Sequence, residues 1–140
     1  MKEERAMSLG KRLVACEGFR WMAGMRPRHL DGVGYLHGAN IPNEDHAKAL
    51  QGNRWWWPDM RDPATRGCVL ELVRDVWSDY RGAGTGRLWI EWTDSPTRGW
   101  IVRSELGGGA VPDEWPLACS EADAMVMAME TASPTAPRST

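Results

Sequence analysis

The sequence predicts an α+β fold in which a small antiparallel sheet has two or three helices packed on one face. Two observations predict the elements: one long segment repeats its apolar residues at helical spacing, and two later segments alternate apolar and polar residues as paired strands do. A third sets the size, since 140 residues with 42% hydrophobic content are typical of one domain. We assign residues 1–132 to that domain and expect residues 133–140, rich in Ser, Thr, Pro and Ala, to be a disordered tail.

The clearest predicted helix runs from Pro63 to Ser78. Asp62 precedes it as the expected N-cap, and proline is favoured at the first helical position because an N–H there would have no partner in the helix. Its apolar face consists of Val69, Leu72, Val73, Val76 and Tyr80. A second helix is expected after Ser120, which forms a capping-box pattern with Asp123. Its apolar face consists of Ala122, Met125, Val126 and Met129.

The two alternating segments are residues 88–93 and 100–103, and the sequence Asp-Ser-Pro-Thr between them is typical of a turn. Together they predict a β-hairpin in which Trp92 and Trp100 flank the turn on adjoining strands.

Shorter patterns predict the remaining elements. A helix is expected over Ser8–Cys16 with Ser8 as its N-cap, a short helix over residues 43–50, and a short strand over residues 33–37. Residues 19–29 contain glycine and proline, which predicts an irregular path.

Nine tryptophans stand against one phenylalanine and two tyrosines. The triplet Trp55, Trp56 and Trp57 reads as a short strand stopped by Pro58, with Trp55 and Trp57 on one face and Trp56 on the other. Because all three cannot face inward from one strand, at least one is a candidate for the surface or for contact with a partner. The alternative is that a loop covers it.

Composition and charge argue against several classes of protein. Seventeen basic and nineteen acidic residues give a net charge of −2, which counts against a dedicated binder of duplex DNA. The charged N-terminus leads into no apolar stretch, so no secretory signal is expected, and no apolar run reaches the length of a membrane span. The three cysteines are odd in number and widely spaced, which signals neither a zinc site nor a redox pair, and a reducing cytoplasm is expected. Cys16 lies on the apolar face of its predicted helix, and Cys68 and Cys119 adjoin helix starts, so buried, inert thiols are expected.

Three segments carry a resemblance to a known family. Residues 19–25 (Phe-Arg-Trp-Met-Ala-Gly-Met) resemble a Trp-Arg-Trp-Met-Pro-Gly-Met signature, residues 62–70 resemble an Asp-Pro-Ala-Thr-Leu-Gly-Cys-Leu-Leu helix start, and residues 120–124 resemble a Ser-Glu-Ala-Glu-Ala helix start. In this order they are similar to a family of small uncharacterised proteins of bacteriophages and prophages. The chain departs from the pattern at Phe19 and Ala23. The resemblance implies a phage accessory protein in the bacterial cytoplasm, and it assigns no functional residue.

The densest group of candidate binding residues lies between positions 20 and 29. Cations there could hold phosphates while a base stacks on an exposed indole, or they could meet an acidic protein surface, where Arg and Trp are frequent hot spots. The group consists of Arg20, Trp21, Arg26, Arg28 and His29. In the other interpretation, which we favour for the apolar members, Trp21, Met22 and Met25 fill the core and the arginines are solvated.

No catalytic, metal or cofactor site is predicted. His29, His37 and His46, with Glu44 and Asp45, match no metal-ligand spacing. The glycine-rich residues 82–86 follow a helix and lack the Gly-Lys-Ser/Thr ending of a phosphate-binding loop.

The leading functional hypothesis is therefore a non-enzymatic phage protein that binds and inhibits or redirects a host protein complex, for example a bacterial immune system. The first alternative is binding of nucleic acid or a nucleotide through an Arg/Trp patch. The second alternative is a small enzyme of unknown class. The binding residues expected under the first two hypotheses are Arg20, Trp21, Arg26, Arg28, Trp55 and Trp56.

Overall fold

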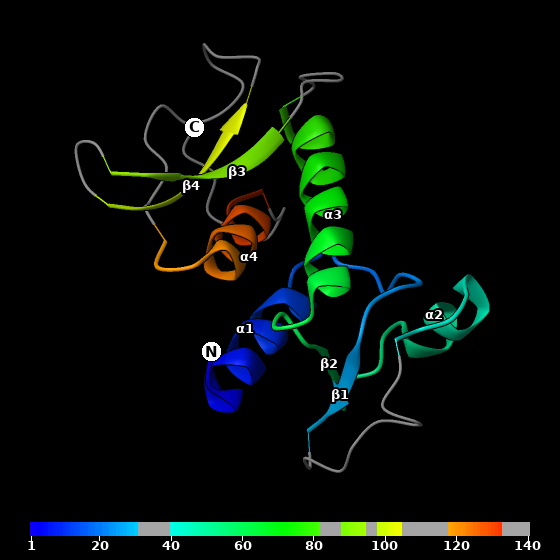
Figure 1. Cartoon of the computed structure of the whole chain (residues 1–140). Coiled ribbons are helices and arrows are strands. Elements are labelled where there is room, and N and C mark those ends of the chain that lie inside the picture. The colour runs from blue at the N-terminus through cyan, green and yellow to red at the C-terminus, as the bar shows by residue number, and fades with distance from the viewer. Residues whose placement is uncertain (31–39, 82–87, 95–97, 105–117, 133–140) are drawn as a thin grey trace.

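The computed structural model describes residues 1–30, 40–81, 88–94, 98–104 and 118–132. Over these ranges four helices and two antiparallel sheets of two strands each confirm the α+β class (Figure 1). The elements in chain order are α1 (Glu3–Val14), β1 (Pro27–His29), α2 (Glu44–Leu50), β2 (Trp56–Pro58), α3 (Pro63–Arg81), β3 (Leu88–Thr93), β4 (Gly99–Ser104) and α4 (Glu121–Ala132). The strand expected over residues 33–37 and the tail expected over residues 133–140 lie outside the described residues.

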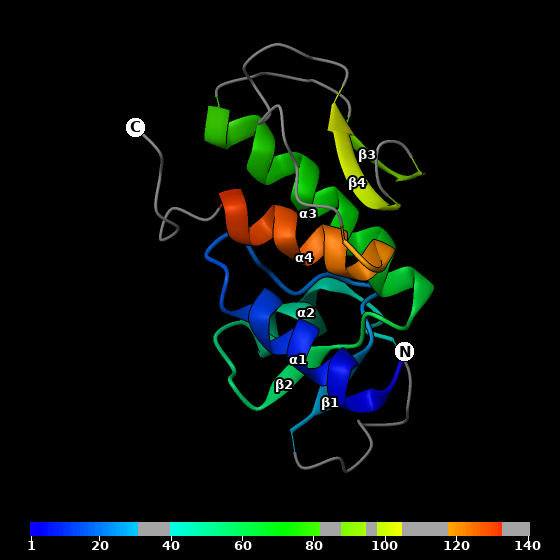
Figure 2. The same cartoon turned by 90° about the vertical axis from the view of Figure 1, so that its left-hand side faces the viewer.

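Helix α4 is the centre of the packing. It lies between α3 and α1 (Figure 2) and also contacts both strands of the β3–β4 hairpin. A helix covered on several sides must be apolar nearly all round, and the described part of α4 is apolar in this way. Its buried apolar residues are Ala122, Ala124, Met125, Val126, Ala128 and Met129. They join buried side chains of all the other helices in one hydrophobic cluster.

Helix α3 begins where the sequence predicts. The carboxylate of Asp62 accepts the backbone N–H of Thr65 at 2.9 Å, which is the expected cap, and the helix continues to Arg81. Val69, Leu72 and Val73 are fully buried on its predicted face. At α4, Ser120 accepts the backbone N–H of Asp123 at 3.1 Å, which confirms the other predicted cap.

The β3–β4 hairpin is also confirmed. Trp92 and Trp100 are cross-strand partners, and their rings meet edge to face with centroids 5.8 Å apart. Trp100 forms a pair of backbone hydrogen bonds with Ala118, which covers part of the outer edge of β4. Trp92 is 52% exposed.

Helix α1 begins five residues earlier than expected, so Ser8 is an exposed residue inside the helix and not its N-cap. The reason is the buried face, which includes Ala6 as well as Leu9 and Leu13 and so starts one turn sooner. Acidic residues in the first turn and basic residues in the last turn stabilise the helix dipole without a side-chain cap. By contrast, α2 has the predicted extent, and Asn43 caps it by accepting the N–H of His46.

The expectation of an irregular path over residues 19–29 is wrong for its last three residues, which form β1 and pair with β2. Strands this short, each with a proline, leave no periodic pattern in the sequence. Strand β2 lies directly on α1: a Cβ at Gly10 would stand 2.7 Å from the carbonyl oxygen of Pro58. Trp57 is consequently buried, whereas Trp55, just before the strand, is 64% exposed. The prediction that Trp55 and Trp57 share one face of a strand therefore does not mean that they are equally exposed.

Candidate functional site

The structure separates the six candidate binding residues into three groups. Trp21 and Trp56 line one pocket, and Arg26 and Arg28 line a different cleft. Arg20 and Trp55 belong to neither of these described linings. The predicted single Arg/Trp patch is therefore not formed, and four of the six residues divide between two separate hollows.

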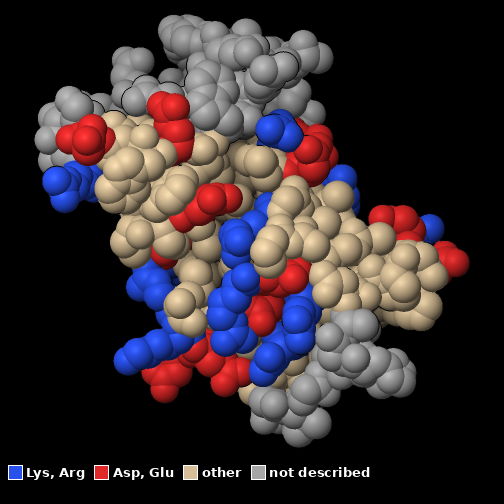
Figure 3. Space-filling view, in the orientation of Figure 1, with Lys and Arg blue, Asp and Glu red and all other residues tan. Residues whose placement is uncertain are grey.

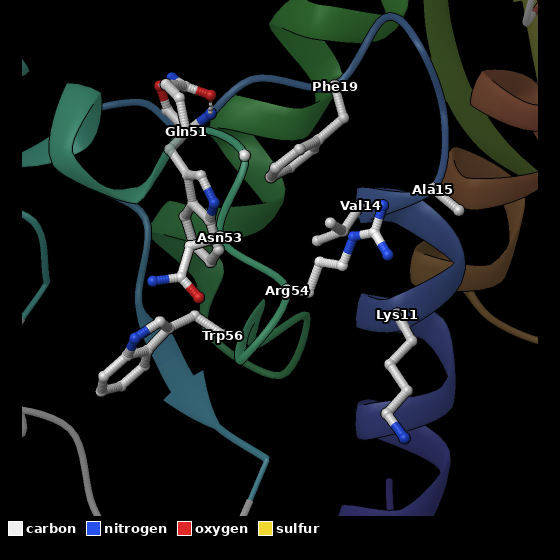
Figure 4. A pocket seen from close by; sticks show the side chains of 10 residues that line it. Lys11, Val14, Ala15, Phe19, Gln51, Asn53, Arg54 and Trp56 are labelled. Carbon is white, nitrogen blue, oxygen red and sulfur yellow. Dashed lines mark hydrogen bonds between the residues drawn. The ribbon is translucent and has the colours of Figure 1, made fainter.

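The first hollow, which we call the aromatic pocket, has a volume of about 560 Å³ and lies between α1, residues 19–21 and residues 51–56 (Figure 4). This volume lies within the range of sites for small ligands. Figure 4 shows Lys11, Val14 and Ala15 on the α1 side, with Gln51, Asn53 and Trp56 on the other side. The complete described lining is Lys11, Val14, Ala15, Phe19, Trp21, Gln51, Gly52, Asn53, Arg54 and Trp56.

Phe19 and Trp21 form an aromatic wall of this pocket, and the close packing of Gly18 on α3 fixes where that wall lies. A Cβ at Gly18 would lie 2.5 Å from Cγ2 of Val76, so only glycine lets the chain pass this near to the helix. The next residue, Phe19, meets Trp21 edge to face with ring centroids 5.4 Å apart. Trp21 is only 2% exposed, so the hypothesis that it is an exposed indole is wrong: it belongs to the core and contributes to the pocket wall.

The opposite wall is fixed by two amides and a turn. The side chain of Gln51 accepts the backbone N–H of Trp21 at 3.2 Å and donates to the carbonyl of Trp21 at 3.0 Å, which ties the two walls together. Gly52 then takes a φ of +77°, which favours glycine, and the chain turns. Asn53 accepts the backbone N–H of Trp55 at 2.8 Å and holds the approach to β2.

Two cations reach the aromatic pocket, Lys11 from α1 and Arg54 from the chain before β2. The described lining contains no carboxylate, so these residues give it two positive charges. Sequence reasoning missed both of them. Lys11 carries no signal beyond its place on the exposed face of a helix, and Arg54 lies 43 positions further along the chain. Only the packing of α1 on β2 brings them to one pocket.

The second hollow, which we call the arginine cleft, has a volume of about 380 Å³ and is lined by Arg26, Arg28, Asp59, Arg61, Asp62 and Pro63. Figure 3 shows basic side chains with acidic ones between them over the region where β1, β2 and the start of α3 lie in Figure 1. The lining holds three guanidinium groups and two carboxylates, so it carries one net positive charge.

Asp59 is the buried counter-ion of this cleft. Arg61 holds it with two side-chain hydrogen bonds of 2.8 Å, one to each carboxylate oxygen, and with its backbone N–H. Burial raises the pKa of Asp59, but the hydrogen bonds of Arg61 and the charges of Arg61 and Arg28 outweigh it and lower the pKa below the ordinary value. The carboxylate is therefore ionised at neutral pH.

Asp62, the second carboxylate of the cleft, is held at the start of α3 by three hydrogen bonds. Besides the N–H of Thr65, it accepts the Thr65 hydroxyl and the Asn40 side-chain amide, each at 2.9 Å. The same Thr65 hydroxyl accepts the backbone N–H of Arg26 at 2.8 Å. The start of α3 thus fixes the backbone from which Arg26 extends.

Arg20, His29 and His46 belong to neither of the two described linings. Arg20 forms an exposed ion pair with Asp75 at 3.2 Å, ten residues along α3 from Thr65 and thus about 15 Å away by helical rise. His46 contacts Asn43, His29 packs edge to face on Trp56, and His37 lies outside the described residues. Within the described ranges, no three His, Cys, Asp or Glu side chains are placed to hold a metal ion.

The cysteines differ in their surroundings. Cys16 is buried, and burial raises its pKa to about 11. Cys68 is half-buried, and burial likewise raises its pKa. The expectation of a buried thiol is wrong for Cys119, which is exposed just before α4, where it contacts Arg5 and Asp123. Cys119 precedes the first residue of α4 and so is not part of the packed face of that helix.

Comparison with models of known protein families, with curated proteins and with solved structures finds no match to this chain. The resemblance to small phage and prophage proteins stays a prediction. None of the helices in the described part of the chain combines the length and apolar composition that crossing a membrane requires.

Proposed function

We propose that this chain is a non-catalytic binding protein and that its aromatic pocket recognises a nucleotide. Nucleotide binding is the first alternative raised by the sequence, but the cations of the proposed site are Lys11 and Arg54 and not the predicted arginines. The observation that carries it is the presence of Lys11 and Arg54 in one pocket with Phe19 and Trp56.

The chemistry of the pocket matches the two parts of a nucleotide. Aromatic rings stack on a nucleobase and tolerate any base, since every base has a π-face. Lysine and arginine side chains attract the phosphate group, and arginine offers a planar fork of donors to it. The absence of carboxylates from the described lining leaves both positive charges available to an anion.

The test is calorimetric titration with adenosine 5′-monophosphate, adenosine and ribose 5-phosphate. We expect the monophosphate to bind most tightly, because only it engages both the rings and the cations. Replacing Lys11 or Arg54 by alanine is expected to weaken its binding about tenfold, which corresponds to one charge-assisted hydrogen bond.

Lys48→Ala is the matched control, because Lys48 is an exposed lysine on α2 outside the described lining of the pocket. It should bind the monophosphate as the natural protein does. Equal binding of adenosine and its monophosphate, or undiminished binding by Arg54→Ala, would remove the proposal.

The second candidate function is the leading hypothesis from the sequence, binding of a host protein complex by a phage accessory protein. One observation favours it: Trp55 is 64% exposed beside Arg54, and Trp and Arg are the residues most enriched at interface hot spots. A pull-down from bacterial lysate with the natural chain and with Trp55→Ala tests it. A host protein retained by the first and lost by the second is the expected result, and an identical set of proteins for both contradicts it.

The site of action that we propose is the bacterial cytoplasm. The support is that Cys16, Cys68 and Cys119 are all free thiols, as proteins of a reducing compartment commonly have.

A further inference from the structure

The arginine cleft is built by a continuation of the β1–β2 pairing. Beyond the paired prolines Pro27 and Pro58, the backbone N–H of Asp59 donates to the carbonyl of Arg26 at 2.9 Å, so Arg26 stands opposite Asp59. Arg26 and Arg28 are two residues apart in this extended chain, and their side chains therefore leave it on the same side. Arg61 joins them from the loop after β2.

The acidic groups of the cleft are already engaged by their neighbours. Asp59 takes three hydrogen bonds from Arg61, and Asp62 takes three from Thr65 and Asn40. Neither carboxylate is within ion-pair distance of Arg26, and no other carboxylate of the described residues is. The Arg26 guanidinium thus has donors to offer to a ligand.

Arg28 is held over the cleft by two contacts of different kinds. Its guanidinium carbon lies 6.0 Å from the centre of the Trp57 ring, a cation–π distance, and the ring is buried beneath it. Its partner Glu3, at 2.6 Å, is a first-turn residue of α1 whose side chain is 52% exposed. A surface ion pair of this kind contributes little and exchanges readily for a stronger anion.

We propose that the arginine cleft is a binding site for a phosphate group, held by Arg26 and Arg28, with Arg61 as the fixed third cation. The planar fork of arginine matches phosphate oxygens in pairs, and a dianion neutralises two guanidinium groups at once. Asp59 binds Arg61 and places a negative charge near Arg28, which reduces the repulsion among the cations when the ligand is absent. This site is separate from the aromatic pocket, with which it shares no described lining residue.

The test is calorimetric titration of the whole chain with inorganic phosphate at constant ionic strength, with chloride as the reference anion. Arg26→Ala and Arg28→Ala are each expected to weaken phosphate binding about tenfold. Alanine at position 26 retains the backbone hydrogen bonds to Thr65 and Asp59, so the fold is expected to persist. Glycerol 3-phosphate titrated in parallel shows whether the group is preferred free or as an ester; a preference for either supports the site.

Two control variants make the result specific. Arg20→Ala removes an exposed arginine from a different ion pair, and Lys48→Ala removes an exposed lysine of α2; both should bind phosphate as the natural protein does. Arg54→Ala, which removes a cation of the aromatic pocket, is titrated beside them. Equal affinity of the natural protein, Arg26→Ala and Arg28→Ala would overturn the proposal. A loss confined to Arg54→Ala would overturn it too, while leaving the nucleotide proposal standing.

Discussion

Asp59 is the most deeply buried carboxylate among the described residues, with 4% of its surface exposed. As a carboxylate it accepts three hydrogen bonds from Arg61. Its pKa is lower in the folded protein than in the unfolded chain, so the unfolded chain binds the proton more tightly. The resulting stabilisation is complete above the unfolded pKa, about 3.9, and is lost as the pH falls through the folded value.

Asp59→Asn is therefore expected to lower the free energy of unfolding at pH 7 by about 1–3 kcal/mol, since the Arg61 guanidinium loses its charged partner. The difference between variant and natural protein should shrink as the pH falls below about 3.9, where the unfolded natural chain binds the proton, and should be lost below the lower pKa of the folded protein. Urea unfolding at a series of pH values measures both effects. Asp75→Asn, in an exposed ion pair, is the control and should change stability by less than about 1 kcal/mol at any pH. A constant effect of Asp59→Asn down to pH 2 contradicts the assignment.

The cysteines provide a second prediction for single residues. At pH 7.5 in the native protein, a thiol reagent is expected to modify Cys119 first and Cys16 only on unfolding, because Cys119 is exposed and Cys16 is buried with a pKa of about 11. Mass spectrometry of partly labelled protein identifies the order. Cys119→Ser should remove the fast phase of modification. Rapid modification of Cys16 in the native state would contradict the burial of its side chain just after α1.

Among the elements, those with a repeated pattern could be predicted from the sequence. The helix after Asp62 and the hairpin around Trp92 and Trp100 lie where the sequence predicts them, because a cap, a turn and several spaced apolar residues agree there. Strand β1 could not be predicted, since three residues beginning with proline have no periodicity. The predicted start of α1 is wrong because Ser8 resembles a cap, whereas the buried face extends back to Ala6.

The contact between α1 and β2 gives a prediction for elements. Gly10→Ala would place a methyl group 2.7 Å from the Pro58 carbonyl and 2.9 Å from the Trp57 ring, so the strand must move. We expect a loss of about 1–3 kcal/mol in the free energy of unfolding, although alanine favours helix. Thermal or urea unfolding measures it. Gly67→Ala, in α3, is the control, because its added carbon meets nothing within 4 Å. This substitution should stabilise the protein slightly, since alanine favours helix. Equal effects of the two substitutions would contradict the close contact.

For the whole molecule, the fold class followed from the sequence but the arrangement of the candidate site did not. Arg26 and Arg28 are neighbours in sequence and stay together, whereas Arg20 pairs with Asp75 elsewhere. The aromatic pocket joins residues from positions 11 to 56, whose proximity depends on the packing of α1, β2 and the Gln51 clamp on Trp21. Sequence spacing contains no information on such a contact.

Nucleotide binding in the aromatic pocket is tested most directly by ¹⁵N–¹H NMR, which follows the indole N–H signals of the nine tryptophans during titration with adenosine 5′-monophosphate. Trp21→Phe and Trp56→Phe identify the two pocket signals. We expect the signals of Trp21 and Trp56 to move and saturate together, while that of Trp92, on the hairpin, stays in place. Signals of Trp21 and Trp56 that remain unchanged at saturating nucleotide would contradict it.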